Sequence, residues 1–183
     1  MARNLKHLSP LIFTIQVLVT ISIIMSIGEC RVYHPNDDTL VESSCKQTPD
    51  PNLCLQIFNS YPRSRTADLR GLGLILVDAI KTRSIPTLNK INQLHQGASG
   101  KLRGALASCS ESYKGILNGD ISVAIAGIES WNFKFAEQAV TDAALEVKYC
   151  QEEFNGIPSP IANENNFVRG AANIAQVIVR LMY

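Results

Sequence analysis

Apolar residues recur at intervals of three and four positions along most of the chain beyond residue 66. The clearest stripe occupies residues 167–181, where Phe, Ala, Ile, Ile and Leu alternate steps of four and three. Such spacing places apolar side chains on one face of a helix and is typical of the buried seam of a bundle. Equivalent stripes occupy residues 69–80, 102–116, 121–128 and 135–154. The pattern predicts an all-α protein, and the short connections favour antiparallel, up-and-down packing.

Proline, glycine and asparagine divide these stripes into separate helices. Pro86 is expected to kink or end the helix that begins near Leu69, because proline lacks a backbone donor. Residues 118–120 predict a short turn, with Asp120 as the N-cap of the following helix. Residues 155–160, which contain a glycine and two prolines, predict the last loop.

The region before the bundle has a different composition. Prolines interrupt the residues between two closely spaced cysteines, so residues 38–60 predict a small helical hairpin. We expect an N-terminal extension with this hairpin over residues 31–65 and the bundle over residues 66–183. Together they are expected to form one domain of about residues 38–183.

Residues 1–30 have the composition of a cleaved secretory signal peptide. A basic start is followed by an uncharged apolar run over residues 11–27 and then by small residues suited to cleavage. A signal anchor is the alternative, but the run is short for a membrane span and contains several hydroxyl residues. Without residues 1–30 the chain has 15 basic and 15 acidic residues, so neither nucleic acid nor an anionic membrane is an expected partner. The sequence therefore predicts a protein of the secretory pathway, with no membrane attachment after cleavage.

The cysteines indicate disulfide bonds. Cys30 lies at the expected cleavage site, which leaves Cys45, Cys54, Cys109 and Cys150 in the mature chain. An even number of cysteines in a secreted chain favours disulfides, and four cysteines allow three pairings. Metal binding is not expected, because no CxxC pair occurs.

The sequence contains no recognisable catalytic constellation. Only His34 and His95 remain as histidines after cleavage, and no metalloprotease, serine-hydrolase or nucleotide-binding motif is present. The carboxylate pairs at 37–38 and 152–153 cannot flank one substrate bond, because adjacent residues on a helix diverge by about 100°. The sequence therefore predicts a protein that is not an enzyme and needs no cofactor.

One short segment has an unusual composition. Residues 130–135 combine the only tryptophan with two phenylalanines around one lysine, immediately before an expected helix. Large aromatic residues at a connection either fill the core or form a contact surface. We interpret Trp131 and Phe135 as core residues, with a contact surface as the alternative. Lys134 has no expected structural role beyond solvation.

Several short motifs surround the four mature cysteines. They are TLVESSCKQTP at 39–49, Leu53-Cys54, ILVDAI at 75–80, Ala107-Ser108-Cys109 with Ser112-Tyr113, and Tyr149-Cys150 with Phe154. With these spacings the mature chain resembles the plant inhibitors of invertase and of pectin methylesterase. The resemblance implies a four-helix bundle with an N-terminal helical hairpin. It also implies two disulfides, Cys45–Cys54 and Cys109–Cys150.

One further motif bears on the two branches of this family. Invertase inhibitors carry Pro-Lys-Phe between two bundle helices, followed by Ala-Glu, and Phe133-Lys134-Phe135-Ala136-Glu137 stands in the matching place. Phe133 replaces the proline. The resemblance implies an inhibitor of acid invertase (β-fructofuranosidase), acting in the cell wall or vacuole. It implies that Phe133, Lys134 and Phe135 bind the target in a one-to-one complex. Inhibition of pectin methylesterase, which the family performs with faces of the bundle helices, is the alternative.

Overall fold

The computed structural model describes residues 39–183. The expected signal peptide, most of the expected extension, Cys30 and His34 lie outside the described residues. In chain order the elements are α2 (Leu40–Cys45), α3 (Pro51–Asn59), the 3₁₀ turn η1 (Pro62–Thr66), α4 (Leu69–Gly97), α5 (Gly100–Gly115), the π-helical turn η2 (Ile116–Asp120), α6 (Ile121–Glu129), α7 (Phe133–Glu152) and α8 (Ala162–Arg180).

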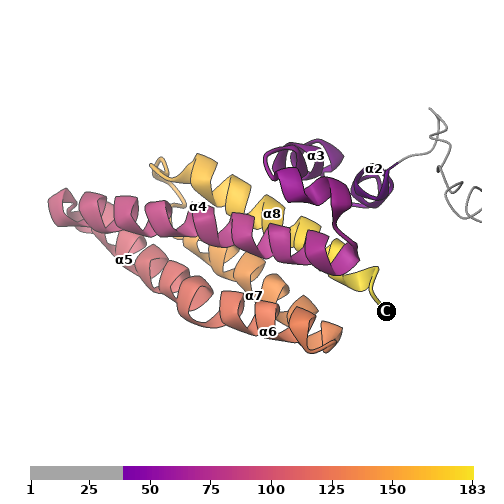
Figure 1. Ribbon diagram of the computed structural model, residues 1–183. Helices are drawn as coiled ribbons and strands as arrows, with labels where there is room; N and C mark the ends of the chain where they lie inside the picture. Colours follow the sequence, from indigo (N-terminus) through magenta and orange to yellow (C-terminus); the bar gives the residue numbers. More distant parts are fainter. Residues whose placement is uncertain (1–38) are drawn as a thin grey trace, which may run out of the picture. The chain divides into compact units, whose positions relative to one another are not determined.

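Four rod-like segments form the bundle: α4, the continuous rod α5–η2–α6, α7 and α8 (Figure 1). Successive rods run in opposite directions. Both α4 and α7 pack against α8 and against the rod α5–η2–α6. The interior is filled by side chains with no exposed surface, among them Leu72, Ile80, Leu106 and Ile174. The prediction of an all-α, up-and-down four-helix bundle preceded by a helical hairpin is confirmed.

The hairpin of α2 and α3 is specified by local signals at its helix starts. Thr39 and Glu42 form a capping box, in which the Glu42 amide donates to Thr39 Oγ1 at 3.2 Å and the Thr39 amide donates to Glu42 Oε2 at 2.9 Å. Asp50 caps α3 with a single side-chain bond, in which its Oδ1 accepts from the Leu53 amide at 2.9 Å. The Cys45–Cys54 disulfide joins the two helices, and α3 packs against α4 and α8.

Pro86 does not end its helix, because α4 continues through it to Gly97. A proline inside a helix costs about 3 kcal/mol, partly through the hydrogen bond that its nitrogen cannot make. Thr82 and Pro86 both lie on the exposed face of α4, where water can satisfy the Thr82 carbonyl. Further along, Thr87 and Ile91 are buried against the neighbouring helices. Packing of the later turns therefore outweighs the missing hydrogen bond.

The prediction of a short turn at residues 118–120 is wrong. The chain stays helical there, and the Ile121 amide donates to the Ile116 carbonyl in a π turn. Ile116 and Ile121 are both buried, and their spacing of five residues matches the π hydrogen bond rather than the α-helical one. Asp120 makes no capping hydrogen bond, and its Oδ2 atom is buried without a partner in the described part of the chain.

The Cys109–Cys150 disulfide links α5 to α7 inside the bundle, and both cysteines are buried. The two disulfides of the structure are thus those that the family resemblance implies. Beside this bridge the buried amide of Asn165 accepts a hydrogen bond from the Tyr113 hydroxyl at 2.9 Å and donates one to Gln151 at 2.8 Å. These polar groups are satisfied inside the core, so the bridged helices pack without an unpaired amide.

Candidate functional site

The aromatic segment forms the turn between α6 and α7. Trp131 has a φ of 62°, the Asn132 amide donates to the Gly127 carbonyl at 2.8 Å, and the Trp131 amide donates to the Ile128 carbonyl at 3.4 Å. These bonds form a Schellman cap, whose left-handed residue is usually glycine. A bulky residue in this conformation costs roughly 1–2 kcal/mol. The geometry turns the Trp131 side chain outward, where it is 67% exposed.

Arg70, in the first turn of α4, braces this strained turn. Its Nε donates to the Ile128 carbonyl at 3.3 Å, and its Nη2 donates to the Glu129 carbonyl at 3.2 Å. Its guanidinium lies over the Trp131 ring, 4.2 Å from the centroid. The last carbonyls of a helix carry partial negative charge, so a cation stabilises them, and the ring adds a cation–π contact. Arg70 therefore offsets part of the strain and fixes the direction of the Trp131 ring.

The end of α6 and the start of α7 approach each other closely at this turn. A Cβ atom at Gly127 would lie 2.7 Å from the backbone nitrogen of Ala136, nearer than packed atoms allow. Glycine is therefore required at this position for the two helices to meet. The turn is held by packed backbone on one side and by Arg70 on the other, so it is a rigid corner.

The structure changes the interpretation of the three aromatic residues. Trp131 and Phe135 are 67% and 63% exposed, so the interpretation of both as core residues is wrong. Phe133 is the buried residue, and its ring centroid lies 5.8 Å from that of Trp131. Because α7 begins at Phe133, its core face starts there, and a side chain two positions later points about 200° away. Lys134 and Phe135 thus lie in the first helical turn and not in a loop.

Lys134 is exposed but has partners. Its side chain is 72% exposed, and its Nζ lies 3.8 Å from Glu137 Oε2 and 3.9 Å from the centre of the Tyr183 ring. Glu137 also accepts hydrogen bonds from the Tyr183 hydroxyl and from Arg180 Nε. These hydrogen bonds, that of Tyr183 first and that of Arg180 second, hold the pKa of Glu137 below its usual value. The lysine is therefore placed by a small polar network and is not simply solvated.

We call residues 131–135 with Arg70, Glu137, Arg180 and Tyr183 the α6–α7 corner. The last four residues were not predicted as part of a site. Arg70, Arg180 and Tyr183 are 43 to 59 residues from their hydrogen-bond partners along the chain, so only the fold brings them together. One sequence signal exists in hindsight. An arginine in the first turn of a helix is disfavoured by the helix dipole, which indicates that its side chain makes its contacts with another helix.

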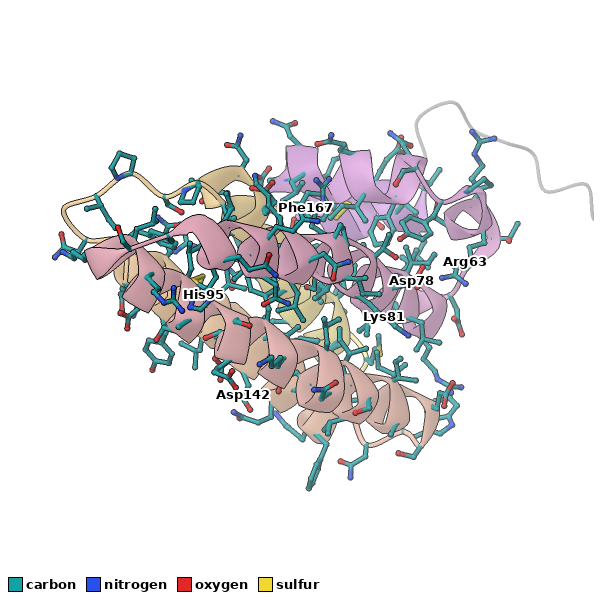
Figure 2. All side chains as sticks on the ribbon, turned by 90° about the vertical axis from the view of Figure 1, so that its left-hand side faces the viewer. Arg63, Asp78, Lys81, His95, Asp142 and Phe167 are labelled. Carbon is teal, nitrogen blue, oxygen red and sulfur yellow. A yellow bond between two sulfur atoms is a disulfide. The ribbon has the colours of Figure 1, made fainter. Side chains whose placement is uncertain are left out.

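The corner has a composition suited to binding rather than to catalysis. It presents the exposed rings of Trp131 and Phe135 on the same segment as an exposed lysine, and large aromatic residues are frequent at the centres of protein interfaces. His95 lies on α4 in a groove with Asn92 and Glu111. Figure 2 shows that this histidine is separated from the carboxylates of Asp78 and Asp142. Among residues 39–183 no group of three His, Cys, Asp or Glu side chains is placed to hold a metal ion.

The chain is thus an all-helical bundle protein whose corner has the composition of a contact surface. Comparison with known proteins gives the family: residues 39–178 match the family described as plant invertase/pectin methylesterase inhibitor, and the chain belongs to this family. The family and the relatives below are described as inhibitors rather than enzymes.

Three relatives illustrate the range of the family. The chain is 41% identical over 143 residues to the cell wall / vacuolar inhibitor of fructosidase 1 of Arabidopsis thaliana, covering 78% of this chain and 69% of that protein. It is 29% identical over 151 residues to inhibitor of fructosidase 2 of the same plant, covering 81% of each. It is also 29% identical over 124 residues to the pectinesterase inhibitor of Actinidia deliciosa, covering 67% of this chain and 66% of that protein.

Solved structures support the fold. A mutant form of a pectin methylesterase inhibitor from Arabidopsis superposes with a TM-score of 0.70 at 21% identity, covering 79% of this chain and 97% of that one. A second structure of a pectin methylesterase inhibitor from Arabidopsis thaliana gives a TM-score of 0.61 at 21% identity, covering 80% and 98%. At this identity the likeness concerns the fold and not the target.

Proposed function

We propose that the chain inhibits a plant acid invertase (β-fructofuranosidase) by inserting the α6–α7 corner into the entrance of its active site, in a one-to-one complex. The observation that carries this proposal is the exposure of Lys134 at the rigid α6–α7 corner, on the same short segment as the exposed rings of Trp131 and Phe135. The relatives named as inhibitors of fructosidase, one of them 41% identical, support invertase as the target.

The chemistry of the target explains how such a corner would act. A retaining glycosidase works with two carboxyl groups about 5–5.5 Å apart, so its substrate pocket is small and acidic. The Lys134 ammonium would pair with these carboxylates, and Phe135 and Trp131 would cover the rim and exclude water, which strengthens the charge interaction. Sucrose would be excluded sterically, and no bond would be made or broken in the inhibitor.

Rigidity is the property that makes a short corner effective. A loop that became ordered only on contact would lose affinity to the entropy of ordering. Here Trp131 is fixed by Arg70, and α7, which carries Lys134 and Phe135, is tied to α5 by the Cys109–Cys150 disulfide. The Phe133 ring is 9% exposed, so we assign it a supporting role behind Trp131 rather than direct target contact.

Inhibition of pectin methylesterase is the second candidate function. The relative from Actinidia deliciosa and the superposing solved structures carry that description. In that case the faces of the bundle helices, and not the corner, would make the contact.

Titration of the purified protein against an acid invertase and against a pectin methylesterase at acidic pH tests the choice. We expect invertase activity to fall to a plateau at one equivalent and esterase activity to stay unchanged. Inhibition of the esterase alone would overturn the proposal in favour of the alternative. A plateau at two equivalents would reject the one-to-one complex.

We further propose that residues 1–30 are removed on export, and that the extension and hairpin (31–65) and the bundle (66–183) act as one domain in the cell wall or vacuole. The relatives named as cell wall / vacuolar inhibitors support this location. Over residues 39–183, none of the helices has the length and apolar character needed to cross a bilayer. N-terminal sequencing of the mature protein and imaging of a fluorescent fusion after plasmolysis test the proposal. A retained N-terminus or a cytosolic signal would contradict it.

A further inference from the structure

The end of the described chain contacts the residue on which the proposed function rests. Tyr183 follows α8, and its ring lies under the Lys134 ammonium at 3.9 Å from the ring centre. Its hydroxyl donates a hydrogen bond to Oε2 of Glu137, the carboxylate oxygen that lies 3.8 Å from Lys134 Nζ. One tyrosine therefore contacts both the lysine and the carboxylate beside it.

Tyr183 is itself held in place by the bundle. The Met182 amide donates to the Val179 carbonyl at 3.1 Å, which continues the helical path beyond α8. The Met182 side chain packs against α4, where a Cβ atom at Gly73 would lie 2.8 Å from its terminal methyl group. The segment after α8 is therefore anchored in the core region, and the Tyr183 ring is presented from a fixed base.

The charges around Glu137 decide what Lys134 can do. Arg180 and Tyr183 both donate to this carboxylate, whose side chain is 15% exposed. Each oxygen of the carboxylate thus has one close donor, and Lys134 lies near Oε2 without a short ion pair. Without the tyrosine hydroxyl, Oε2 would be free to form a close ion pair with Lys134. Such a pair would pull the ammonium down onto α7 and away from a bound partner.

We propose that Tyr183 is a positioning residue of the α6–α7 corner. Its ring holds the Lys134 ammonium through a cation–π contact, and its hydroxyl donates a hydrogen bond to the Glu137 carboxylate, which would otherwise form a close ion pair with Lys134. This inference rests on the proposed function, since it concerns how Lys134 is presented to the acidic pocket of the target. A lysine side chain loses much rotamer freedom when it is immobilised on binding. A ring that already restricts the ammonium lowers that cost before the target arrives.

The test compares Tyr183→Ala with Tyr183→Phe in inhibition of acid invertase. We expect Tyr183→Ala to weaken inhibition roughly three- to tenfold, the value of one pre-ordered side chain. Tyr183→Phe retains the ring and should lose less. Tyr149→Ala is the matched control, because Tyr149 is equally exposed and its ring lies 6.0 Å from another lysine, Lys148, near the far end of α7. That control should inhibit as the parent does.

A spectroscopic readout separates positioning from general stability. The ring current of Tyr183 should shift the ε-methylene protons of Lys134 upfield in the free protein. The shift should weaken in Tyr183→Phe, where Glu137 can capture the ammonium, and disappear in Tyr183→Ala. A Lys134 resonance at the same position in the parent and in Tyr183→Ala would overturn the inference, whatever the melting temperatures of the variants.

A double-mutant cycle with Lys134→Ala completes the test. If Tyr183 acts through Lys134, Tyr183→Ala should cause no further loss of inhibition in the Lys134→Ala background. An equal loss in both backgrounds would overturn the positioning role in favour of direct contact between the ring and the target. If Lys134→Ala weakens inhibition but Tyr183→Ala does not, the inference fails and the proposed function stands. If neither variant weakens inhibition, the corner itself is not the inhibitory site.

Discussion

At the scale of single residues, Trp131 is the most unusual feature of the molecule. It occupies a left-handed backbone conformation that glycine adopts at lower cost, and its ring is exposed rather than buried. Strain of this kind persists where the surroundings over-determine it. Here the two hydrogen bonds and the ring contact of Arg70 hold Trp131 in this conformation. The result is a rigid aromatic surface adjacent to Lys134.

Substitution of Arg70 tests this brace. Arg70→Ala removes the guanidinium donor from the Ile128 and Glu129 carbonyls, and we expect a loss of about 1–2 kcal/mol in the free energy of unfolding. Calorimetry should show a melting temperature lower by a few degrees. Arg103→Ala, at an exposed position of α5, is the control and should be close to neutral. Equal melting temperatures for the two variants would show that Arg70 does not brace the turn.

The residue types of the corner are predictable from sequence, but their orientations are not. The match of Lys134 and Phe135 to the family tripeptide singles out this segment. The exposure of Trp131 and the burial of Phe133 depend on where α7 begins, and a shift of two residues in that start reverses which ring faces the core. Their role in target binding stays a prediction.

At the scale of elements, the apolar stripes predict α7 and α8 well, because each buries one regular face. The continuation of α4 through Pro86 and the absence of a turn at residues 118–120 have a common cause. Both segments contain residues that favour a break, but burial of side chains on both sides keeps the chain helical. At η2 this continuous helix is unfavourable for Asp120, because its carboxylate is partly removed from water.

Asp120 makes stability depend on pH. Burial, followed by the negative charges of Asp142 and Glu146, raises the pKa of Asp120 from 3.8 to about 6. Folding therefore favours the protonated carboxyl, so its contribution is complete below about pH 4 and is lost as the pH rises through 6. The variant Asp120→Asn does not titrate. Its melting temperature should exceed that of the parent at pH 7 and approach it near pH 4.

Thermal unfolding between pH 4 and pH 7 measures this effect. Glu153→Gln, which removes an exposed carboxylate at the end of α7, is the control and should follow the pH profile of the parent. Parallel profiles for the parent and Asp120→Asn would mean that the raised pKa of Asp120 does not affect folding.

At the scale of the whole molecule, the two disulfides constrain different lengths of chain. Cys45 and Cys54 are 9 residues apart and close only the hairpin, whereas Cys109 and Cys150 are 41 apart and join two rods of the bundle. The bundle end that carries the corner brings together the start of α4, the α6–α7 turn and the end of α8. Its geometry therefore depends on the packing of all four rods.

Removal of each disulfide should have an unequal effect. In the chain-entropy description, replacing Cys109 and Cys150 by alanine costs about 4 kcal/mol, and replacing Cys45 and Cys54 costs about 2.7 kcal/mol. Urea unfolding of the two double variants should therefore give the lower midpoint for the variant without the long bridge. A lower midpoint for the hairpin variant would contradict this order and place more of the stability in the hairpin.

The most direct test of the central claim is the inhibition constant of Lys134→Ala against acid invertase, measured beside that of Lys148→Ala. Both lysines are exposed residues of α7 with a glutamate and a tyrosine ring nearby, but only Lys134 lies at the corner. Removing one partner of a desolvated charge pair commonly costs about 2–5 kcal/mol. We therefore expect inhibition to weaken by roughly thirty- to several-thousand-fold in Lys134→Ala. Lys148→Ala should match the parent, and both variants should melt near the parent temperature. Equal inhibition by the parent and Lys134→Ala would contradict the account and move the search to the faces of the bundle helices.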